Sequence, residues 1–194
     1  IAAGGRQLYL ATNGGGLSIF DRASARFRAV GVADGLPAEH YNAIDLPKPG
    51  TLYLASRSGL HRLDWQGDPM AAAFAVKPIE VGANPPRRDI WELRRGPSGL
   101  WVGSGDGVFR VDADDRVHAL EVPGAQRPFN VDSLLEVPAG TLWVGTWNQG
   151  LFRIELASGA VRRFLPGSAD APGLRTTRIL KLAAGPGGSV YIGS

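Results

Sequence analysis

The sequence predicts an all-β protein made of repeated four-stranded antiparallel sheets, on the basis of three observations. A five-residue apolar block recurs along the chain, a second block that begins with glycine follows each copy, and the 194 residues include 27 glycines and 14 prolines. Such a composition is typical of many short strands joined by tight turns. A recurrence of this kind indicates units that bury their faces against copies of one another.

The apolar block predicts the second strand of each unit. Its copies begin at residues 8, 52, 100, 142 and 190, so the unit repeats every 42 to 48 residues. Because successive positions are apolar, we expect both faces of this strand to be covered. The second residue is always aromatic and the fourth is alanine or glycine, as in Trp143 and Gly145. We interpret this pair as a bulky wedge followed by a close backbone approach where neighbouring sheets converge.

Three further strands complete the predicted unit. A third strand starts at a glycine, and the polar connector before it predicts a hairpin. An outer strand follows at 26–30, 73–76, 117–120 and 161–164, with charged residues beside apolar ones, as expected for a guarded sheet edge. An inner strand precedes the next apolar block at 41–46, 89–93, 131–137 and 177–182.

Four-stranded sheets of this length, packed face to face around an axis, are β-propeller blades. We expect a single propeller segment, 1–194, with blades that begin near residues 8, 41, 89, 130 and 177. Three blades are complete and partial blades lie at both ends: the first lacks its innermost strand and the last holds only two strands. Because closed propellers have about four to eight blades, we expect a fragment of a longer propeller. Closure by sharing strands with a second copy is the alternative.

Composition excludes several functions. The net charge is +3, and its arginines are scattered while the lysines are only Lys48, Lys77 and Lys181, which argues against a nucleic-acid interface. Cysteine is absent, so disulfides, thiolate metal sites and cysteine nucleophiles are excluded. The longest apolar run, 70–76, is too short to cross a bilayer, and we expect no membrane contact within this segment.

Residues 32–44 and 49–60 resemble the two-component regulator propeller repeat. That family's unit has a Gly-Leu-Pro turn, an inner strand, a glycine turn, Leu-Trp-Ile-Gly-Thr, and a Gly-Leu strand closed by Asp. Here the turn is Gly35-Leu36-Pro37, and residues 142–146 read Leu-Trp-Val-Gly-Thr. The resemblance covers nearly the whole chain, although tyrosine replaces tryptophan in three copies.

The resemblance implies the sensor region of a bacterial membrane receptor, such as a hybrid histidine kinase or a diguanylate cyclase. It implies a periplasmic propeller that binds a ligand, without catalytic residues or a cofactor, and a homodimer formed through the parent receptor. A kinase or cyclase output domain would follow in the full-length protein.

Connectors inside the hairpins and those leading into the inner strands are expected on one propeller face, around the channel mouth. The predicted rim residues are Arg57, Arg88, His40, Tyr41, Trp147 and Asn148, with Arg87 and Gln149 beside them. We expect an unknown small molecule or oligosaccharide to bind there. Trp147 is the strongest candidate because an aromatic residue in a polar connector can stack on a sugar. Inter-blade packing is its alternative explanation.

Two other functions remain open. A propeller lyase or glycan hydrolase would need a converging acid and base, and the available residues are His40, Asp45, Glu92, Asp132 and Glu136. Asp45, Glu92 and Glu136 are expected at equivalent places along the channel, as solvated or salt-bridged lining. A protein-interaction scaffold would instead show a broad apolar patch on the rim. No two histidines have metal-ligand spacing, so no metal site is predicted.

Overall fold

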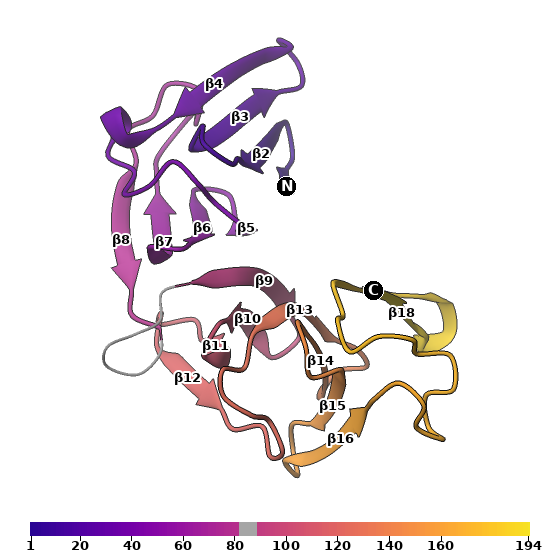
Figure 1. The fold of residues 1–194 in the computed structure, drawn as a ribbon. Coiled ribbons are helices and arrows are strands. Elements are labelled where there is room, and N and C mark those ends of the chain that lie inside the picture. The colour runs from indigo at the N-terminus through magenta and orange to yellow at the C-terminus, as the bar shows by residue number, and fades with distance from the viewer. Residues whose placement is uncertain (82–88) are drawn as a thin grey trace. The chain divides into compact units, whose positions relative to one another are not determined.

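The computed structural model describes residues 1–81 and 89–194, which divide into two compact units, Ile1–Leu93 and Arg94–Ser194 (Figure 1). Nearly all of the regular structure is β. The helices in the described residues are two 3₁₀ turns, Val32–Asp34 and Pro186–Gly188. No helix in this part of the chain is long and apolar enough to cross a membrane.

The first unit contains two antiparallel sheets whose strands follow chain order. The first sheet is β1 (Ala2–Gly4), β2 (Gln7–Ala11), β3 (Leu17–Asp21) and β4 (Arg26–Val30). The second is β5 (Ala43–Lys48), β6 (Thr51–Ser56), β7 (Gly59–Asp64) and β8 (Ala75–Ile79). The first sheet is more complete than predicted, because β1 supplies the innermost strand that we expected to be missing. A strand of three residues is too short to show a side-chain alternation in the sequence.

The remaining sheets repeat this arrangement. The third is β9 (Ile90–Gly96), β10 (Gly99–Ser104), β11 (Gly107–Val111) and β12 (Val117–Leu120), and the division between the units falls within β9. The fourth is β13 (Val131–Glu136), β14 (Thr141–Thr146), β15 (Leu151–Glu155) and β16 (Ala160–Phe164). A two-stranded sheet follows, β17 (Lys181–Ala184) and β18 (Val190–Gly193). The all-β fold of four-stranded antiparallel propeller blades is thus confirmed.

The predicted convergence of neighbouring sheets at the fourth position of the apolar block is confirmed in the second unit. A Cβ atom added to Gly103 would lie 2.8 Å from Cγ1 of Val131, in the next blade. One added to Gly145 would lie 2.7 Å from Cγ2 of Ile179, again one blade further on. Both distances are shorter than carbon atoms tolerate, so an alanine at either position would force the neighbouring side chain to shift.

The side chains of an inner strand point alternately toward the two neighbouring blades. In β13, Leu134 packs into the core that contains Trp101 of the preceding blade. The next residue, Leu135, packs with Ile179 and Leu182 of the following blade. This alternation follows from the two-residue period of a strand. A polar side chain in the middle of an inner strand therefore faces a neighbouring sheet.

Candidate ligand-binding site

Trp147 and Asn148 lie in the connector between β14 and β15, and both are exposed. The Trp147 side chain retains 47% of its accessible surface, so it is not required to fill the core. Its backbone N–H donates a 3.1 Å hydrogen bond to the carbonyl of Asn130, which fixes the start of the connector. Inter-blade packing therefore explains the position of the Trp147 backbone, while about half of the side-chain surface remains exposed to solvent.

Arg178, which the sequence analysis did not single out, stacks on Trp147. Its guanidinium carbon lies 3.5 Å from the centre of the indole ring. This is a close cation–π contact between two exposed residues. Backbone hydrogen bonds on either side of Arg178 hold it there: the Gly150 N–H donates to the Thr177 carbonyl, and the Ile179 N–H donates to the Thr146 carbonyl, each at 2.8 Å.

These two backbone bonds also explain why the last inner strand starts later than predicted. Residues 177 and 179 pair with the connector of the preceding blade, so β17 begins only at Lys181. The sequence could have suggested Arg178 as a candidate only because it is a positively charged residue next to a predicted connector. The register that places it over Trp147 depends on a contact between blades, which a linear pattern does not contain.

Asp132 adds an acidic group to this region. It occupies a bulge at the start of β13, between the register positions of Val131 and Ser133. A bulge re-aims the side chain of the extra residue. Its Oδ2 atom is buried and has no hydrogen-bond partner among the described residues. Burial raises the pKa of Asp132, and the positive charges of Arg178 and Lys181 oppose that shift.

We call Trp147, Arg178 and Asp132 the Trp147 cluster. It combines an exposed aromatic ring, a guanidinium with hydrogen-bond donors and a carboxyl group with one unsatisfied oxygen. Such a mixture of one apolar face and a few polar groups is the usual composition of a site for a small polar ligand. All three residues lie in the second unit.

Gln149, predicted on the same rim, has a structural role. Its side chain is buried and its Oε1 accepts a hydrogen bond from the Gln126 N–H at 2.8 Å. Its Nε2 donates to the carbonyls of Gln126 and Pro128, at 2.7 and 3.0 Å. With both ends of the amide satisfied, Gln149 holds the preceding loop and offers no free group to a ligand.

The other predicted rim residues belong to the first unit or lie outside the described residues. Arg57 is exposed and its guanidinium lies 5.3 Å from the centre of the Trp91 ring. His40 is exposed and forms an isolated β-bridge with Asn13. Arg88, like Arg87, lies outside the described residues. Because Arg57 and His40 are in the first unit and Trp147 is in the second, their sharing of one rim stays a prediction.

Tyr41, like Gln149, is buried, with 4% of its surface exposed. It packs in the core cluster of the first unit. Burial raises the pKa of its phenol to about 12, so the hydroxyl stays protonated at neutral pH. Its backbone N–H donates to the Thr12 carbonyl at 2.9 Å, in the same way that Ile179 pairs with Thr146. Tyr41 therefore serves the packing of its blade.

The predicted acidic column is wrong. Asp45 pairs with Tyr53 across its sheet, whereas Glu136 pairs with Leu142, the equivalent of Leu52. The two acids are therefore one position apart in the repeat, and a shift of one residue turns a side chain to the opposite face. Glu136 is buried between two blades of the second unit and does not line a channel.

Glu136 is fully engaged in hydrogen bonds. Its carboxylate accepts bonds from the N–H and hydroxyl of Ser98, at 3.0 and 2.6 Å, and from the Trp101 indole N–H, at 2.8 Å. The Gly140 N–H adds a fourth bond, at 3.2 Å. Burial raises the pKa of Glu136, but these hydrogen bonds outweigh it and hold the pKa below its ordinary value. An acid held ionised in this way is unsuited to donate a proton.

No group of three or more histidine, cysteine or acidic side chains within the described residues could hold a metal ion. Asp132 and Glu136 lie on one strand, about 13 Å apart at the usual rise per residue. A converging acid and base is therefore not formed by this pair.

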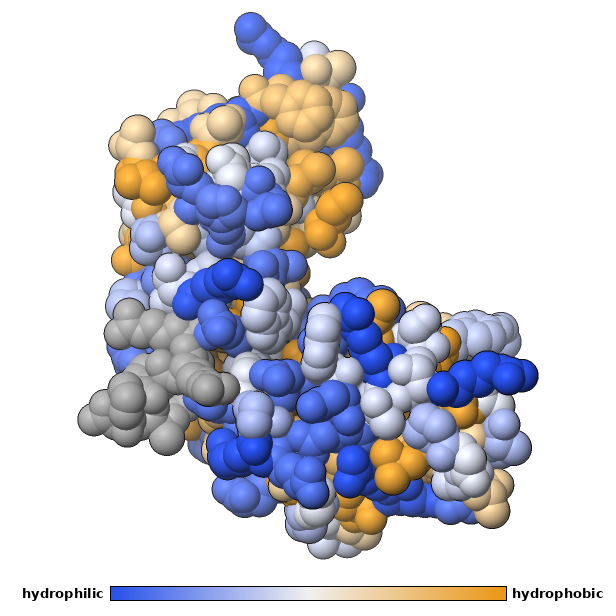
Figure 2. All heavy atoms as spheres, viewed as in Figure 1, coloured by the Kyte–Doolittle hydropathy of each residue, from blue (hydrophilic) through white to orange (hydrophobic). Residues whose placement is uncertain are grey.

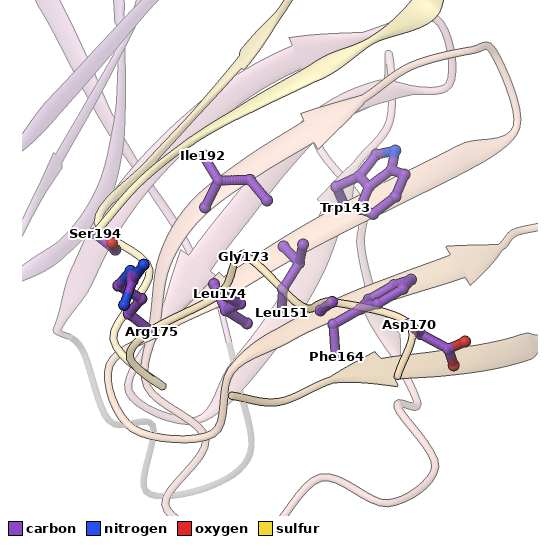
Figure 3. Close-up of a pocket in the computed structure, with 10 residues that line it drawn as sticks. Trp143, Leu151, Phe164, Asp170, Gly173, Leu174, Arg175, Ile192 and Ser194 are labelled. Atoms are coloured by element: carbon purple, nitrogen blue, oxygen red, sulfur yellow. The ribbon is translucent and has the colours of Figure 1, made fainter. Parts of the chain in front are cut away.

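An apolar cavity of about 470 Å³ lies between β14–β16 and β18 (Figure 3). Its lining includes Trp143, which stacks on Phe164 with ring centres 5.9 Å apart, and Ile192. Between the preceding pair of blades, Phe152 and Ile154 of the third strand β15 fill the corresponding space against Trp101. The two-stranded sheet β17–β18 has no such strand within the described residues.

A broad apolar patch is not seen on the face shown in Figure 2, where hydrophobic residues form separate small areas among hydrophilic ones. The exposed large hydrophobic residues of the described chain are Ile1, Phe27, Val32, Trp147, Leu180, Tyr191 and Ile192, and Leu180 pairs with β18, which holds Tyr191 and Ile192. This distribution does not favour a protein-interaction scaffold over a ligand-binding module.

No protein-family model matches the sequence, and no curated protein matches it. Solved structures do. The extracellular domain of the hybrid two component system BT4673 from B. thetaiotaomicron aligns over 99% of this chain with a TM-score of 0.80 and 20% identity. That of BT3049 from the same organism aligns over 98%, with a TM-score of 0.76 and 17% identity. Virginiamycin B lyase from Staphylococcus aureus aligns over 96%, with a TM-score of 0.69 and 12% identity.

These likenesses establish the class of fold. The chain has the β-propeller blade fold found in extracellular domains of hybrid two-component systems, and the resemblance predicted from the repeat is confirmed at the level of the fold. The chain spans 25% of the length of the BT4673 domain, 24% of the BT3049 domain and 59% of the lyase.

Proposed function

We propose that this chain is a non-enzymatic sensory segment of a bacterial signal-transduction receptor, located outside the cytoplasm in the periplasm. Two kinds of support meet here. The structural neighbours with TM-scores of 0.80 and 0.76 are extracellular domains of hybrid two-component systems. Within this chain, one of the candidate acids, Glu136, is tied up in four hydrogen bonds.

The Trp147 cluster is the proposed contact point for the ligand. The carrying observation is the stack of Arg178 on the exposed Trp147, beside a buried Asp132 oxygen without a described partner. An oligosaccharide or a small polar metabolite can place an apolar ring face beside the indole. It can also accept hydrogen bonds from Arg178, whose charge acts on the buried carboxyl group of Asp132.

Signalling would follow from the position of the cluster between two blades. Trp147 belongs to the fourth sheet, and Arg178 leads into the fifth. A ligand that contacts both Trp147 and Arg178 favours one arrangement of the fourth and fifth sheets over others. Such a ligand can shift a receptor between two states only if it binds one state more tightly than the other.

A thermal-shift titration of this chain with a panel of oligosaccharides and small metabolites tests the proposal. We expect at least one compound to stabilise the wild-type chain increasingly with concentration. The Trp147→Ala variant should lose this stabilisation, because the stacking face is removed. Phe27→Ala is the matched control, since it removes an exposed aromatic ring from β4, in the other unit.

An active compound that stabilises Trp147→Ala as strongly as the wild type would place the ligand elsewhere. Turnover of any panel compound by the chain, followed by chromatography, would contradict the non-enzymatic part of the proposal.

A further inference from the structure

Residues 46–56 of the second blade and 136–146 of the fourth align without a gap. Equivalent residues have the same structural roles. Gly50 and Gly140 both adopt a positive φ, 83° and 84°. The hydroxyls of Thr51 and Thr141 each donate a 2.9 Å hydrogen bond to the acid that ends the third strand. Each segment therefore serves as a template for the other.

One aligned position differs in chemistry, with Leu46 in the second blade and Glu136 in the fourth. The surroundings of the two side chains correspond. A Cβ added to Gly4 would collide with Leu46, and one added to Gly96 would collide with Glu136. Between the third and fourth blades, the carboxylate of Glu136 binds donors of the β9–β10 turn, the β13–β14 turn and Trp101. Leu46 brings no oxygen to the same place.

The space beside Leu46 remains open as a cavity of about 630 Å³ in the first unit. Its lining residues come from the turn ends of the first two blades and from the segment after β7, and they include Tyr9, Leu46, Lys48, Arg62, Asp64 and Trp65. Tyr9 is the repeat equivalent of Trp101, which donates to Glu136 in the other blade pair. The volume falls within the usual range for small-molecule sites, about 300 to 1,000 Å³.

One wall of this cavity is specific to the second blade. Trp65 follows β7 at the position of Leu156 in the fourth blade, and both donate a backbone N–H to the glycine of the turn, Gly50 or Gly140. In the second blade an insertion, residues 65–72, begins at this point. The centre of the Trp65 ring lies 5.6 Å from the centre of the Tyr9 ring.

The insertion is held in place by the first blade. Arg28 of β4 donates hydrogen bonds to the carbonyls of Pro69 and Ala72, at 2.7 and 2.8 Å. Its guanidinium also lies 5.2 Å from the centre of the Phe74 ring. The cavity wall is therefore formed before any ligand arrives, which reduces the entropy cost of binding.

The lining residues carry one more positive than negative side chain, and the negative charge of Asp68 also acts on Tyr9. Among the described lining residues, Lys48 and Arg62 are positive and Asp64 is negative. Arg62 and Asp64 form an ion pair at 2.8 Å, which leaves the exposed Lys48 as the excess charge. Gln66 supplies an amide group that can bind hydroxyls. Gln7 and Thr51 already donate hydrogen bonds to Asp21 and Asp64, and their oxygens can still accept hydrogen bonds from hydroxyls. Burial and then Asp68 raise the pKa of Tyr9, so its hydroxyl remains a donor.

We infer that this cavity binds a small polyhydroxy acid of the sugar-acid class, with its carboxylate in the place that the Glu136 carboxylate holds in the other blade pair. The inference does not depend on the proposed function, because its residues are separate from the Trp147 cluster.

Isothermal titration calorimetry of this chain with sodium D-glucuronate and D-galacturonate tests the inference, with D-glucose and D-galactose as neutral counterparts. We expect saturable binding of at least one acid, about tenfold or more tighter than its neutral counterpart. The Leu46→Glu variant copies the fourth blade and supplies the carboxylate internally, so it should abolish binding. Lys48→Gln should weaken acid binding about tenfold, and the control Arg26→Gln, on exposed β4, should leave it unchanged.

Absence of saturable binding by both acids overturns the inference, and so does undiminished binding to a folded Leu46→Glu variant. If Leu46→Glu fails to fold by circular dichroism, Lys48→Gln decides, and equal affinity of this variant and the wild type for the acid overturns the inference. Trp147→Ala should bind the acid normally, which separates this site from the Trp147 cluster.

Discussion

The indole N–H of Trp101 donates a 2.8 Å hydrogen bond to the carboxylate of Glu136, which joins the third blade to the fourth. Ser98 and Gly140 contribute further bonds to the same carboxylate. One buried acid thus satisfies donors from two turns and one side chain. Removing it would leave the buried Trp101 donor and the partly buried donors of Ser98 and Gly140 without this partner.

Glu136→Gln should therefore lower the free energy of unfolding by about 2 to 4 kcal/mol, because the new amide NH₂ faces donors and the charge-assisted bonds are lost. Urea denaturation at neutral pH measures this loss. Glu121→Gln is the matched control, since Glu121 is exposed, and it should change stability by less than about 0.5 kcal/mol. An equal effect of both substitutions would show that the carboxylate does not join the blades.

The same carboxylate predicts a pH dependence. Because the pKa of Glu136 is lower in the folded chain than in the unfolded chain, its contribution is complete above the unfolded value, about 4.3, and is lost as the pH falls through the folded value. The stability difference between the wild type and Glu136→Gln should shrink as the pH falls below 4. Urea midpoints of both proteins between about pH 7 and pH 3 check this, and a difference that grows toward acid would contradict it.

Gly145→Ala should destabilise the second unit by about 1 to 3 kcal/mol, because the added methyl group would lie 2.7 Å from Cγ2 of Ile179. The control is Gly173→Ala, where an added Cβ has no neighbour within 4 Å. Thermal unfolding of the two variants makes the comparison. Equal melting temperatures would mean that the neighbouring blade moves aside at no cost.

Gln149 and Trp147 lie two residues apart and should respond in opposite ways to truncation. Gln149→Ala should cost about 1 to 3 kcal/mol of stability, because the buried Gln149 side chain is lost together with its hydrogen bonds to the backbone groups of Gln126 and Pro128. Trp147→Ala should stay within about 1 kcal/mol of the wild type, since it loses mainly the exposed contact with Arg178. Chemical denaturation separates the two, and a larger loss for Trp147→Ala would assign the tryptophan to packing.

Local patterns allowed the sequence to predict the fold. The apolar block with its glycine or alanine identified β6, β10 and β14, and two outer strands, β4 and β12, have the predicted bounds. β1 was missed because three residues carry no detectable alternation. The outer strand of the second blade was placed two residues early because the insertion before it has no counterpart in the other blades.

The candidate site was only partly predictable, because contacts between blades decide which rim residues are available. A polar connector identified Trp147, but the burial of Gln149 depends on carbonyls that lie more than twenty residues away. Arg178 reaches Trp147 through backbone pairing with the preceding blade. Asp45 and Glu136 were predicted to be equivalent from the spacing of the acidic residues alone. Strand register decides which face each side chain occupies, and that spacing does not reveal the register.

The backbone bond from Gly150 to the Thr177 carbonyl has a counterpart in the first unit, where the Gly16 N–H donates to the Glu39 carbonyl, also at 2.8 Å. Both of these hairpin connectors are thus completed by chain that leads into the following blade. If one blade were cut out on its own, the glycine N–H of its connector would have no acceptor. The carbonyl that it normally bonds to, in the chain leading into the following blade, would lose its donor. Truncated or circularly permuted versions should therefore end after these paired carbonyls. Because each such bond joins two neighbouring blades, we expect structure to be lost in overlapping pairs of blades and not one blade at a time.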